Sequence, residues 1–529
     1  MKNKTYINFR SNWNLTRKNY IEWVAKNKLK KFCLENCQMD GFSIWWATKI
    51  VSKDNVNYPN WYIDLKKIFT EKNYQIKKRK FFWLTFFLKF IKNFTIKILC
   101  ISFIKIICFT RYNKYYQKNL FHSYDYDFSK KKDKKFSNNL YGKILESSKK
   151  KNLILLTVIK FNFFFKNLFY FKKIRNLVFI DEYVSLKDLM YINFYSLYFL
   201  FKLIRFTRKN KDSFIIKNLN CENILKPLLF ESFCGEIQNS YVMAKSIFNF
   251  MKKHKVKKFI TYGEFTPGYR LVYFFVKKIK PLPKVITFQH GHANSLFNFH
   301  EESEFAKTRN KFEGILYSPC PDIYFVQGSQ FFKRLQKFFK RKIKIIGAPR
   351  YDNFDFKKIQ NFEIKELNKN KKNLLICTSI GDHEYIIDLI SKTYDKKFNY
   401  ILSPHPDNKS EVVNFYKKKY QSKFNFYLLD NFTTKQLINV SDLVITGLSN
   451  SCLESQFFGV PSLRVANPEK PDYLDHKEKI KIICTVQELK KILNKSRFTN
   501  LKIKKLNVLE KNYFFKFDNK AYKRFWKYS

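Results

Sequence analysis

A chain of 529 residues exceeds the size at which one hydrophobic core stops growing, so at least two domains are expected. Its 10 cysteines form no CxxC pair and no signal-peptide pattern precedes them, which argues against a disulfide framework and predicts reduced thiols in the cytosol. The formal net charge of +59 comes from lysines spread along the whole chain. Because nucleic-acid binding needs basic residues gathered on one face, this even spread predicts no nucleic-acid partner.

Such a charge favours an anionic membrane as the partner, and nucleic acid stays only as an alternative. A strongly basic chain is drawn to anionic membrane surfaces, where each nearby Lys or Arg contributes about 1 kcal/mol. We therefore expect a cytoplasmic protein that is peripheral at the inner face of the cytoplasmic membrane. A basic nucleic-acid-binding protein is the alternative, and its signature would be a basic face with stacking aromatic side chains.

Residues 1–117 are expected to form a helical region, because their tryptophans have helical spacing and no alternating strand pattern occurs. Within it, residues 81–110 are strongly apolar. The segment nevertheless contains Lys89, Lys92, Lys97 and Lys105. A lysine near the bilayer centre costs about 2.5–3.5 kcal/mol, so a membrane-spanning helix is not expected. Two readings stay open: a membrane-interfacial helix whose lysines snorkel, and a buried helical hairpin.

From residue 118 to 350, short apolar runs alternate with helix-length segments, which predicts a parallel sheet covered on both faces. The expected strands are 119–126, 152–159, 176–183, 257–264, 284–291, 322–328 and 342–350. The polar stretch 351–372 is typical of a linker. A second series follows within 373–500, with strands expected at 373–379, 398–406, 424–430, 442–447 and 461–465, and a helix or tail at 501–529.

These patterns predict an α/β fold: two doubly wound Rossmann-type domains that face each other across a cleft, preceded by the helical region. In such sheets ligands bind beyond the carboxyl ends of the strands. The residues that follow the strands are therefore the candidates for function.

In the first domain, one strand ends at Glu264 and the next ends just before His290 and His292. If the two strands form a right-handed βαβ unit, Glu264 and His290 emerge at the same edge of the sheet. A carboxylate and an imidazole placed together can take a proton from an acceptor hydroxyl. Alternatively, Glu264 only favours the dipole of the following helix, and His290 satisfies backbone groups in a tight loop.

In the second domain, the strand over 398–406 ends in Ser-Pro-His-Pro. The prolines, Pro406 among them, restrict the backbone and fix the direction of His405. A histidine held in this way can donate to a phosphate oxygen and stabilise charge on a phosphate leaving group. The alternative is a rigid turn with an exposed imidazole.

The stretch from 441 to 465 has the pattern strand, Gly-Ser loop, helix, Gly-Val-Pro turn, strand. Ser449, Asn450 and Ser451 lie where the helix begins, so hydroxyls and free backbone N–H groups converge there on one anion. Glu454, in the first turn, is positioned to hold a ribose hydroxyl. Simple capping of the helix would need only one of these residues.

Two further motifs are weaker. Arg350, in "GAPRYDNF", can contact a phosphate, although a hinge role is equally compatible with the sequence. The "DYD" of Asp125 to Asp127 is similar to a metal-binding DxD, but no His or Cys cluster supports a metal. No metal and no cofactor is expected.

Taken in order, seven segments resemble the GT-B glycosyltransferases of bacterial surface-polysaccharide synthesis, of the O-antigen and capsule type. They are "MDGFSIWWATKI", "FHSYDYDF", "TYGEFTPGYR", "TFQHGHANSLFNF", "GAPRYDNF", "SPHP" and "ITGLSNSCLES", within residues 39 to 465. The His-Pro and Ser elements are also similar to those of bacterial sialyltransferases and capsule Kdo transferases. "GAPRYD" resembles a motif of CDP-glycerol polymerases.

The resemblance implies transfer of a sugar from a nucleotide-activated donor, CMP-activated sugars included, onto a surface polysaccharide or lipid-linked glycan. The second domain would bind the donor and the first the acceptor. By match, the donor residues would be Arg350, His405, Pro406, Ser449, Asn450, Ser451 and Glu454. Glu264 would be the base, helped by His290, and the cleft would be lined by His292, Asp125 and Tyr269. The open alternatives are a CDP-glycerol-type polyol-phosphate transferase and a non-catalytic scaffold of the same fold.

Overall fold

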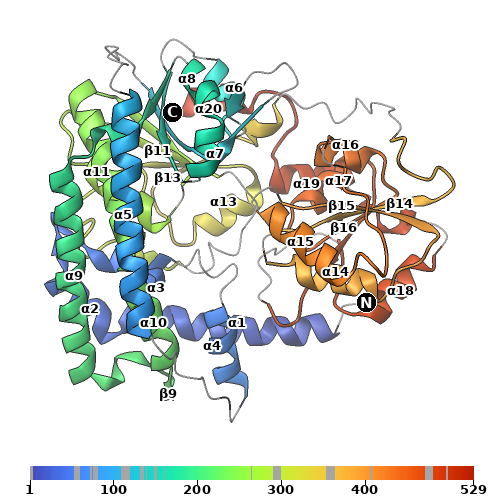
Figure 1. The fold of residues 1–529 in the computed structure, drawn as a ribbon, viewed down its shortest axis with the longest axis horizontal. Coiled ribbons are helices and arrows are strands. Elements are labelled where there is room, and N and C mark those ends of the chain that lie inside the picture. The colour runs from blue at the N-terminus through green and yellow to red at the C-terminus, as the bar shows by residue number, and fades with distance from the viewer. Residues whose placement is uncertain are drawn as a thin grey trace.

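The fold is seen in a computed structural model of the chain. It describes residues 4–529 apart from 53–59, 72–73, 75–81, 109–118, 131–135, 139, 148–151, 160, 175, 264, 290–299, 353–363, 380, 406–407, 430, 471–479 and 496–497. Two parallel sheets, of seven and five strands, are covered by helices (Figure 1). The predicted α/β class with two parallel sheets is confirmed.

The first part of the chain is helical. Its helices are α1 (Lys4–Lys26), α2 (Lys28–Asn36), α3 (Lys49–Ser52), α4 (Asn60–Thr70) and α5 (Phe82–Cys108). Between α2 and α3, two short antiparallel strands, β1 (Gln38–Met39) and β2 (Phe42–Ser43), form a hairpin. α5 is one continuous helix, so the alternative of a helical hairpin over 81–110 is wrong. Among the described residues, no helix combines the length and apolar character that a bilayer crossing requires.

The seven-stranded sheet has the order β13-β12-β11-β10-β3-β6-β7, and every neighbouring pair is parallel. Its strands are β3 (Asn119–Tyr124), β6 (Asn152–Thr157), β7 (Leu177–Phe179), β10 (Lys258–Thr261), β11 (Lys284–Phe288), β12 (Ile323–Val326) and β13 (Lys342–Ile345). All seven predicted runs therefore contain a strand, and each strand ends before its run does. We call this sheet and the helices on it the first lobe.

Alternate residues of β6 enter two different cores. Leu153 and Leu155 face the core shared with α9 (Leu186–Lys209), α10 (Glu222–Glu231), α11 (Glu236–His254) and α12 (Pro267–Val276). Ile154 and Leu156 face the core shared with α6 (Lys143–Glu146), α7 (Phe161–Lys166) and α8 (Leu168–Lys173). Because side chains alternate along a strand, both faces can be buried only if the whole run is apolar.

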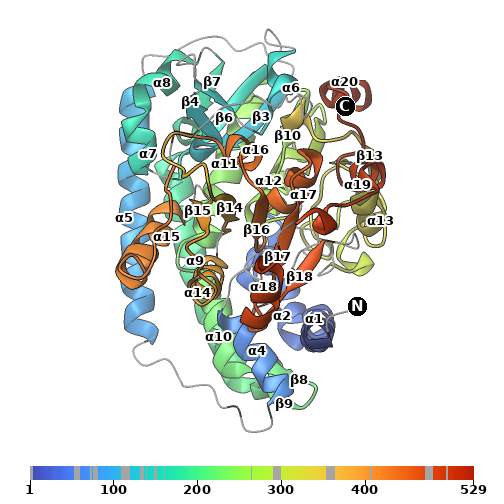
Figure 2. The same cartoon turned by 90° about the vertical axis from the view of Figure 1, so that its right-hand side faces the viewer.

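The five-stranded sheet forms the second lobe, in the order β15-β14-β16-β17-β18. Its strands are β14 (Lys372–Cys377), β15 (Phe398–Ser403), β16 (Leu443–Thr446), β17 (Ser462–Val465) and β18 (Lys481–Ile483). The helices beside it are α14 (His383–Ser391), α15 (Lys409–Lys419), α16 (Thr434–Asn439), α17 (Ser451–Phe457) and α18 (Val486–Leu493). Figure 2 shows both lobes turned by 90°.

The strand predicted over 424–430 is wrong, because within the described residues 424–429 the only strand-like pairing is an isolated bridge between Tyr427 and Ile401. The Tyr416 hydroxyl accepts from Phe426 N (3.0 Å) and donates to the Phe424 carbonyl (2.9 Å). A side chain thus satisfies backbone groups that a strand ladder would have used. β18 was not predicted, since its run is short and interrupted by lysine.

The C-terminal residues return to the first lobe, where α19 (Leu506–Tyr513) packs on α13 (Ser329–Leu335) and α20 (Ala521–Tyr528) packs on α6. Phe525 of α20 is fully buried and packs against Phe325 of β12, with ring centroids 5.2 Å apart. Asp352 accepts from the backbone N–H groups of Ala521 (3.0 Å) and Tyr522 (2.7 Å) at the start of α20. The central part of the predicted linker, 353–363, lies outside the described residues.

Candidate functional site

Each sheet has a point where the strand order reverses. In the first lobe the chain proceeds outward from β3 to β7 on one side and from β10 to β13 on the other, so the reversal lies between β3 and β10. In the second lobe β15 flanks β14 on one side and β16 flanks it on the other, so the reversal lies between β14 and β16. Connections diverge at such points, which leaves a crevice for ligands at the carboxyl ends of the strands.

At the first reversal, two aspartates of the predicted DYD motif hold loops in place. Asp125 is fully buried and accepts from the backbone N–H of Ile159 (3.1 Å). Asp127 accepts from Tyr124 N (2.7 Å) and from the Tyr262 hydroxyl, which follows β10. Burial raises the pKa of Asp127 to about 6. In the described part of the chain, no group of three His, Cys, Asp or Glu residues could hold a metal ion.

Tyr269, which the sequence places at the cleft, is only 1% exposed. Its hydroxyl lies 2.6 Å from Nδ1 of His122, whose Nε2 lies 2.7 Å from the Thr157 hydroxyl. Burial lowers the pKa of His122 to about 3, so its imidazole is neutral at ordinary pH. Asp125 and Tyr269 are thus buried and hydrogen-bonded within the first lobe, and their place along the cleft stays a prediction. The sequence shows that a residue follows a strand, but it does not show whether the side chain is buried or faces the cleft.

Gly263 lies against the Tyr269 ring. A Cβ atom at position 263 would stand 1.7 Å from that ring, so only glycine fits between β10 and α12. Gly263 directly precedes Glu264, and Glu264 itself lies outside the described residues. The close approach of Gly263 to Tyr269 therefore fixes the backbone immediately before the predicted base.

His290 and His292 also lie outside the described residues, but the residue before them is well defined. Gln289 N donates to the Phe325 carbonyl (2.9 Å), and the Gln289 carbonyl accepts from the Gln327 side chain (3.0 Å). Gln327 N in turn donates to the Gln289 side chain (3.2 Å). The sequence analysis did not single out Gln327. It could have been found because it directly follows β12, which is paired with β11.

At the second reversal, the predicted serine loop begins α17. The hydroxyls of Ser449 and Ser451 lie 3.0 Å apart, and Ser451 N donates to the Ser449 hydroxyl (3.3 Å). Asn450 precedes the helix, and its side chain makes no capping hydrogen bond. The two hydroxyls and this backbone N–H therefore converge on one spot at the edge of the sheet.

A buried carboxylate joins the two loops of this reversal. Asp382 accepts from Ser379 N (2.6 Å), after β14, and from Leu448 N (2.7 Å), after β16. Burial raises the pKa of Asp382 to about 7. A Cβ atom on Gly447 would stand 2.2 Å from the Asp382 carboxylate. The sequence did not single out Asp382, because one aspartate before a helix carries no motif.

His405 follows β15 at the same edge of the sheet and is exposed, whereas Pro406 lies outside the described residues. The His405 carbonyl accepts from Asn408 N (3.2 Å). Nearby, the Ser403 hydroxyl lies 3.1 Å from that of Thr434, the first residue of α16. Since β14 separates β15 from β16, the strand ends that carry His405 and Ser449 are about two strand spacings, or roughly 10 Å, apart.

The two lobes meet beside the serine loop. Arg350, after β13, forms an ion pair of 3.2 Å with Glu454 of α17. The Tyr351 hydroxyl donates to the Glu454 carboxylate and accepts from Arg350. The sequence predicts that Arg350 and Glu454 contact a phosphate and a ribose, but in this structure each is engaged with the other. Because they are 104 positions apart, no local pattern could have shown the pair.

A second cation completes this cluster. Lys435 of α16 lies with its ammonium 4.9 Å from the centroid of the Tyr351 ring, and burial lowers its pKa to about 8. Arg350 Nε is buried and, within the described residues, has no hydrogen-bond partner. We call Arg350, Tyr351, Lys435 and Glu454 the interlobe cluster. The cluster places two half-buried cations beside one carboxylate, and a half-buried positive charge attracts an anion.

No known protein family matches the sequence, and no curated protein matches it either. Solved structures with a similar arrangement include UDP-GlcNAc 2-epimerase from Neisseria meningitidis, at 11% identity and a TM-score of 0.41, over 77% of this chain and 98% of that one. The UDP-GlcNAc 2-epimerase of Methanocaldococcus jannaschii aligns at 14% identity and a TM-score of 0.38, over 78% and 99%. The wall teichoic acid polymerase TagF aligns at 11% identity and a TM-score of 0.39, over 84% and 97%. Similarities at this level do not identify a reaction.

Proposed function

We propose that this protein is a metal-independent transferase of the GT-B type that moves a sugar from a nucleotide-activated donor onto a surface polysaccharide or a lipid-linked glycan. The observation that carries the proposal is the interlobe cluster. Two half-buried cations, Arg350 and Lys435, lie beside a serine loop at the point where the strand order of the second sheet reverses. A phosphate group has the charge that this combination would stabilise.

The donor would bind at the second lobe. Its phosphates would lie between the hydroxyls of Ser449 and Ser451 on one side and the cations of the cluster on the other. His405, at the same sheet edge, would donate to the leaving phosphate as the bond to the sugar breaks. Glu454 would hold Arg350 in place and, on donor binding, exchange part of that ion pair for a ribose hydroxyl.

The acceptor would bind at the first lobe, over residues 118–350, and the donor over residues 373–500. Glu264 would be the base that takes the acceptor proton, with His290 beside it. Its support is that β10, which precedes Glu264, flanks the reversal of the first sheet. No metal enters the reaction, because the two cations neutralise charge on the leaving phosphate.

The test is a thermal-shift panel of CMP, UDP, GDP, CDP-glycerol and their sugar conjugates. A ligand that binds the native state raises the melting temperature by mass action, so one nucleotide class is expected to stand out. Lys435→Ala should weaken that shift. Its matched control is Lys417→Ala, since Lys417 is an exposed lysine of α15 in the same lobe. The absence of any shift for all nucleotides would overturn the proposal.

A polyol-phosphate transfer, as from CDP-glycerol, is the second candidate. It is favoured by the pair of cations, because the group transferred in that reaction carries a phosphate of its own. The two reactions differ in the product. Phosphorus NMR of the polymer would show a phosphodiester linkage for the polyol-phosphate transferase and none for the glycosyltransferase.

A further inference from the structure

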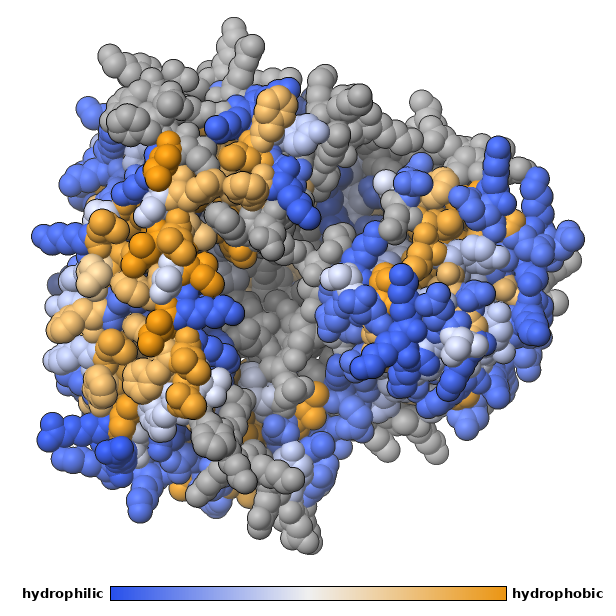
Figure 3. Space-filling view, in the orientation of Figure 1, coloured by the Kyte–Doolittle hydropathy of each residue, from blue (hydrophilic) through white to orange (hydrophobic). Residues whose placement is uncertain are grey.

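Two helices of the first lobe present apolar side chains to solvent. On α5, five aliphatic residues are at least 59% exposed: Leu84, Leu88, Ile91, Leu99 and Ile106. On α9, four apolar residues are at least 60% exposed: Leu186, Met190, Phe194 and Phe201. In each helix these positions recur at intervals close to whole turns, so they form a continuous stripe along one side. Figure 3 shows the resulting apolar area over α5 and α9, which we call the apolar face.

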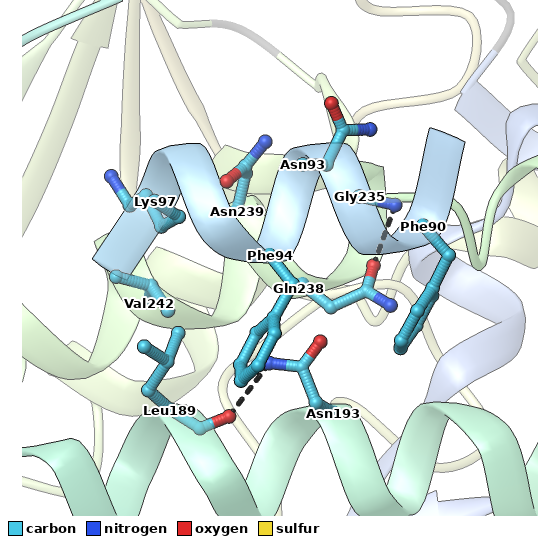
Figure 4. A pocket seen from close by; sticks show the side chains of 10 residues that line it. All are labelled: Phe90, Asn93, Phe94, Lys97, Leu189, Asn193, Gly235, Gln238, Asn239 and Val242. Atoms are coloured by element: carbon cyan, nitrogen blue, oxygen red, sulfur yellow. Dashed lines mark hydrogen bonds between the residues drawn. The ribbon is translucent and has the colours of Figure 1, made fainter. Parts of the chain in front are cut away.

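The other side of α5 is fixed to the protein by polar contacts. Lys97 forms an ion pair of 2.8 Å with Asp181, which is 1% exposed, and the Asn93 amide donates to the Cys234 carbonyl. Gly235 leaves room for Asn93, since a Cβ atom there would stand 2.7 Å from its amide. A small cavity between α5, α9 and α11 lies along this seam (Figure 4). These contacts fix the rotation of α5 about its own axis, so that its apolar stripe faces solvent.

Basic residues accompany the stripes. α5 carries four lysines and no acidic residue, and α9 carries five basic residues and one acidic residue, Asp188. Lys89 and Lys92 of α5 are exposed. The second lobe carries a further exposed run, Lys417 to Lys419, at the end of α15. Exposed Leu and Ile flanked by lysines, whose long stems can lie along an apolar surface, suit the boundary between acyl chains and head groups.

We propose that the apolar face docks on an anionic lipid bilayer, with the α5 and α9 stripes in the acyl boundary and the lysines at the head groups. The inference goes beyond the proposed reaction, because it concerns where the protein works. Charge complementarity selects this occupant: long lysine side chains can reach anionic head groups while the stripe stays buried. A symmetric contact with a second copy would bring the same lysines together and repel. Nucleic acid would leave the aliphatic stripe of α5 without bases to stack on it.

The test is co-sedimentation of the full chain with vesicles of phosphatidylcholine alone and with 30% phosphatidylglycerol. Binding to the anionic vesicles is expected, and it should persist in part at high salt, because insertion of apolar side chains is not screened. The variant Leu84→Asn, Leu88→Asn, Leu99→Asn, Met190→Asn and Phe194→Asn should bind at least about tenfold more weakly. All five side chains are largely exposed, so this variant is expected to fold.

The matched control is Leu282→Asn, Leu316→Asn and Val508→Asn, which changes exposed apolar residues outside α5 and α9. It should bind vesicles as the wild type does. Trp83 of α5 is 40% exposed, so lipids with a quencher in the acyl chain should reduce its fluorescence, and Trp83→Phe should remove that part of the quenching. Failure of the wild type to bind anionic vesicles, or equal binding by the five-residue variant, would overturn the proposal.

Two other results would overturn the membrane proposal and assign the apolar face to a different partner. A concentration-dependent dimer that the same five substitutions dissociate would assign the face to a second copy. Loss of RNA binding in the five-residue variant, with vesicle binding unchanged, would assign it to nucleic acid. The nucleotide thermal shift should be the same in this variant and the wild type, so that failure of membrane docking and failure of the proposed reaction are distinguishable.

Discussion

Arg350 and Glu454 form an ion pair of 3.2 Å, although one follows the last strand of the seven-stranded sheet and the other lies in a helix of the five-stranded sheet. Their side chains are 25% and 12% exposed. The pair therefore links the two lobes directly beside the serine loop, in surroundings where screening by water is reduced.

Glu454→Gln should destabilise the protein. Without the carboxylate, Arg350 and Lys435 are left facing each other as like charges, and breaking a partly buried pair on one side costs about 1–3 kcal/mol. Urea unfolding measures the change in the free energy of unfolding. Arg350→Met together with Glu454→Gln should cost less than the sum of the single changes, whereas additive costs would show that the pair is not coupled.

His405→Ala should abolish most of the transfer and leave stability unchanged, because the imidazole is exposed. Loss of a donor that stabilises a developing charge lowers kcat by roughly 10²–10³-fold. The measurement is the rate of donor consumption at saturating nucleotide-sugar, with the melting temperature as the check on folding. Turnover at the wild-type rate would remove His405 from the mechanism.

Asp382 should make stability depend on pH. Its pKa in the folded protein is about 7, whereas an unfolded aspartate titrates near 3.9. Between those values the folded state keeps a proton that the unfolded state has released, so the free energy of unfolding falls as the pH rises from about 4 to about 7. Asp382→Asn should reduce this slope in urea midpoints measured across that range.

Asp395→Asn is the control for that series. The side chain of Asp395 is at the surface, and hydrogen bonds from Lys397 lower the pKa of its carboxyl. Since it is ionised in both states above about pH 5, its replacement should leave the slope between pH 5 and 7 as in the wild type. An unaltered slope in Asp382→Asn would show that this carboxyl does not titrate in the range.

Gly263→Ala should disturb the first lobe, because its Cβ atom would stand 1.7 Å from the Tyr269 ring. The ring is fully buried and held to His122, so it cannot move aside cheaply, and a cost of about 1–3 kcal/mol is expected. Gly268→Ala is the matched control: its Cβ atom would meet only the flexible end of Met243, and it lies in α12, where alanine is favoured. Thermal denaturation of the two variants compares them, and equal melting temperatures would contradict the prediction.

The strands were largely predictable because the centre of a parallel strand buried on both faces must be apolar, as residues 153–156 are. The same rule was wrong at 424–430, where the hydroxyl of Tyr416, a residue of the preceding helix, satisfies the backbone. A side chain that replaces a ladder leaves no trace in the hydrophobic pattern.

The place of Ser449 and Ser451 at the start of a helix that follows a strand was predictable from the local sequence. The candidate site was not predictable where a residue acts through a distant partner. Lys435 is one lysine among many, and only the packing of α16 against α17 places it near Glu454. The pairing of Arg350 with Glu454 likewise depends on how two separately folded sheets meet.

The return of α20 to the first lobe means that the chain passes between the lobes twice, once after β13 and again between α18 and α19. Two covalent connections restrain relative twisting more than one would, so opening and closing about the axis that joins them becomes the easiest movement. Removal of α19 and α20 together would leave one connection and free the lobes to twist relative to each other.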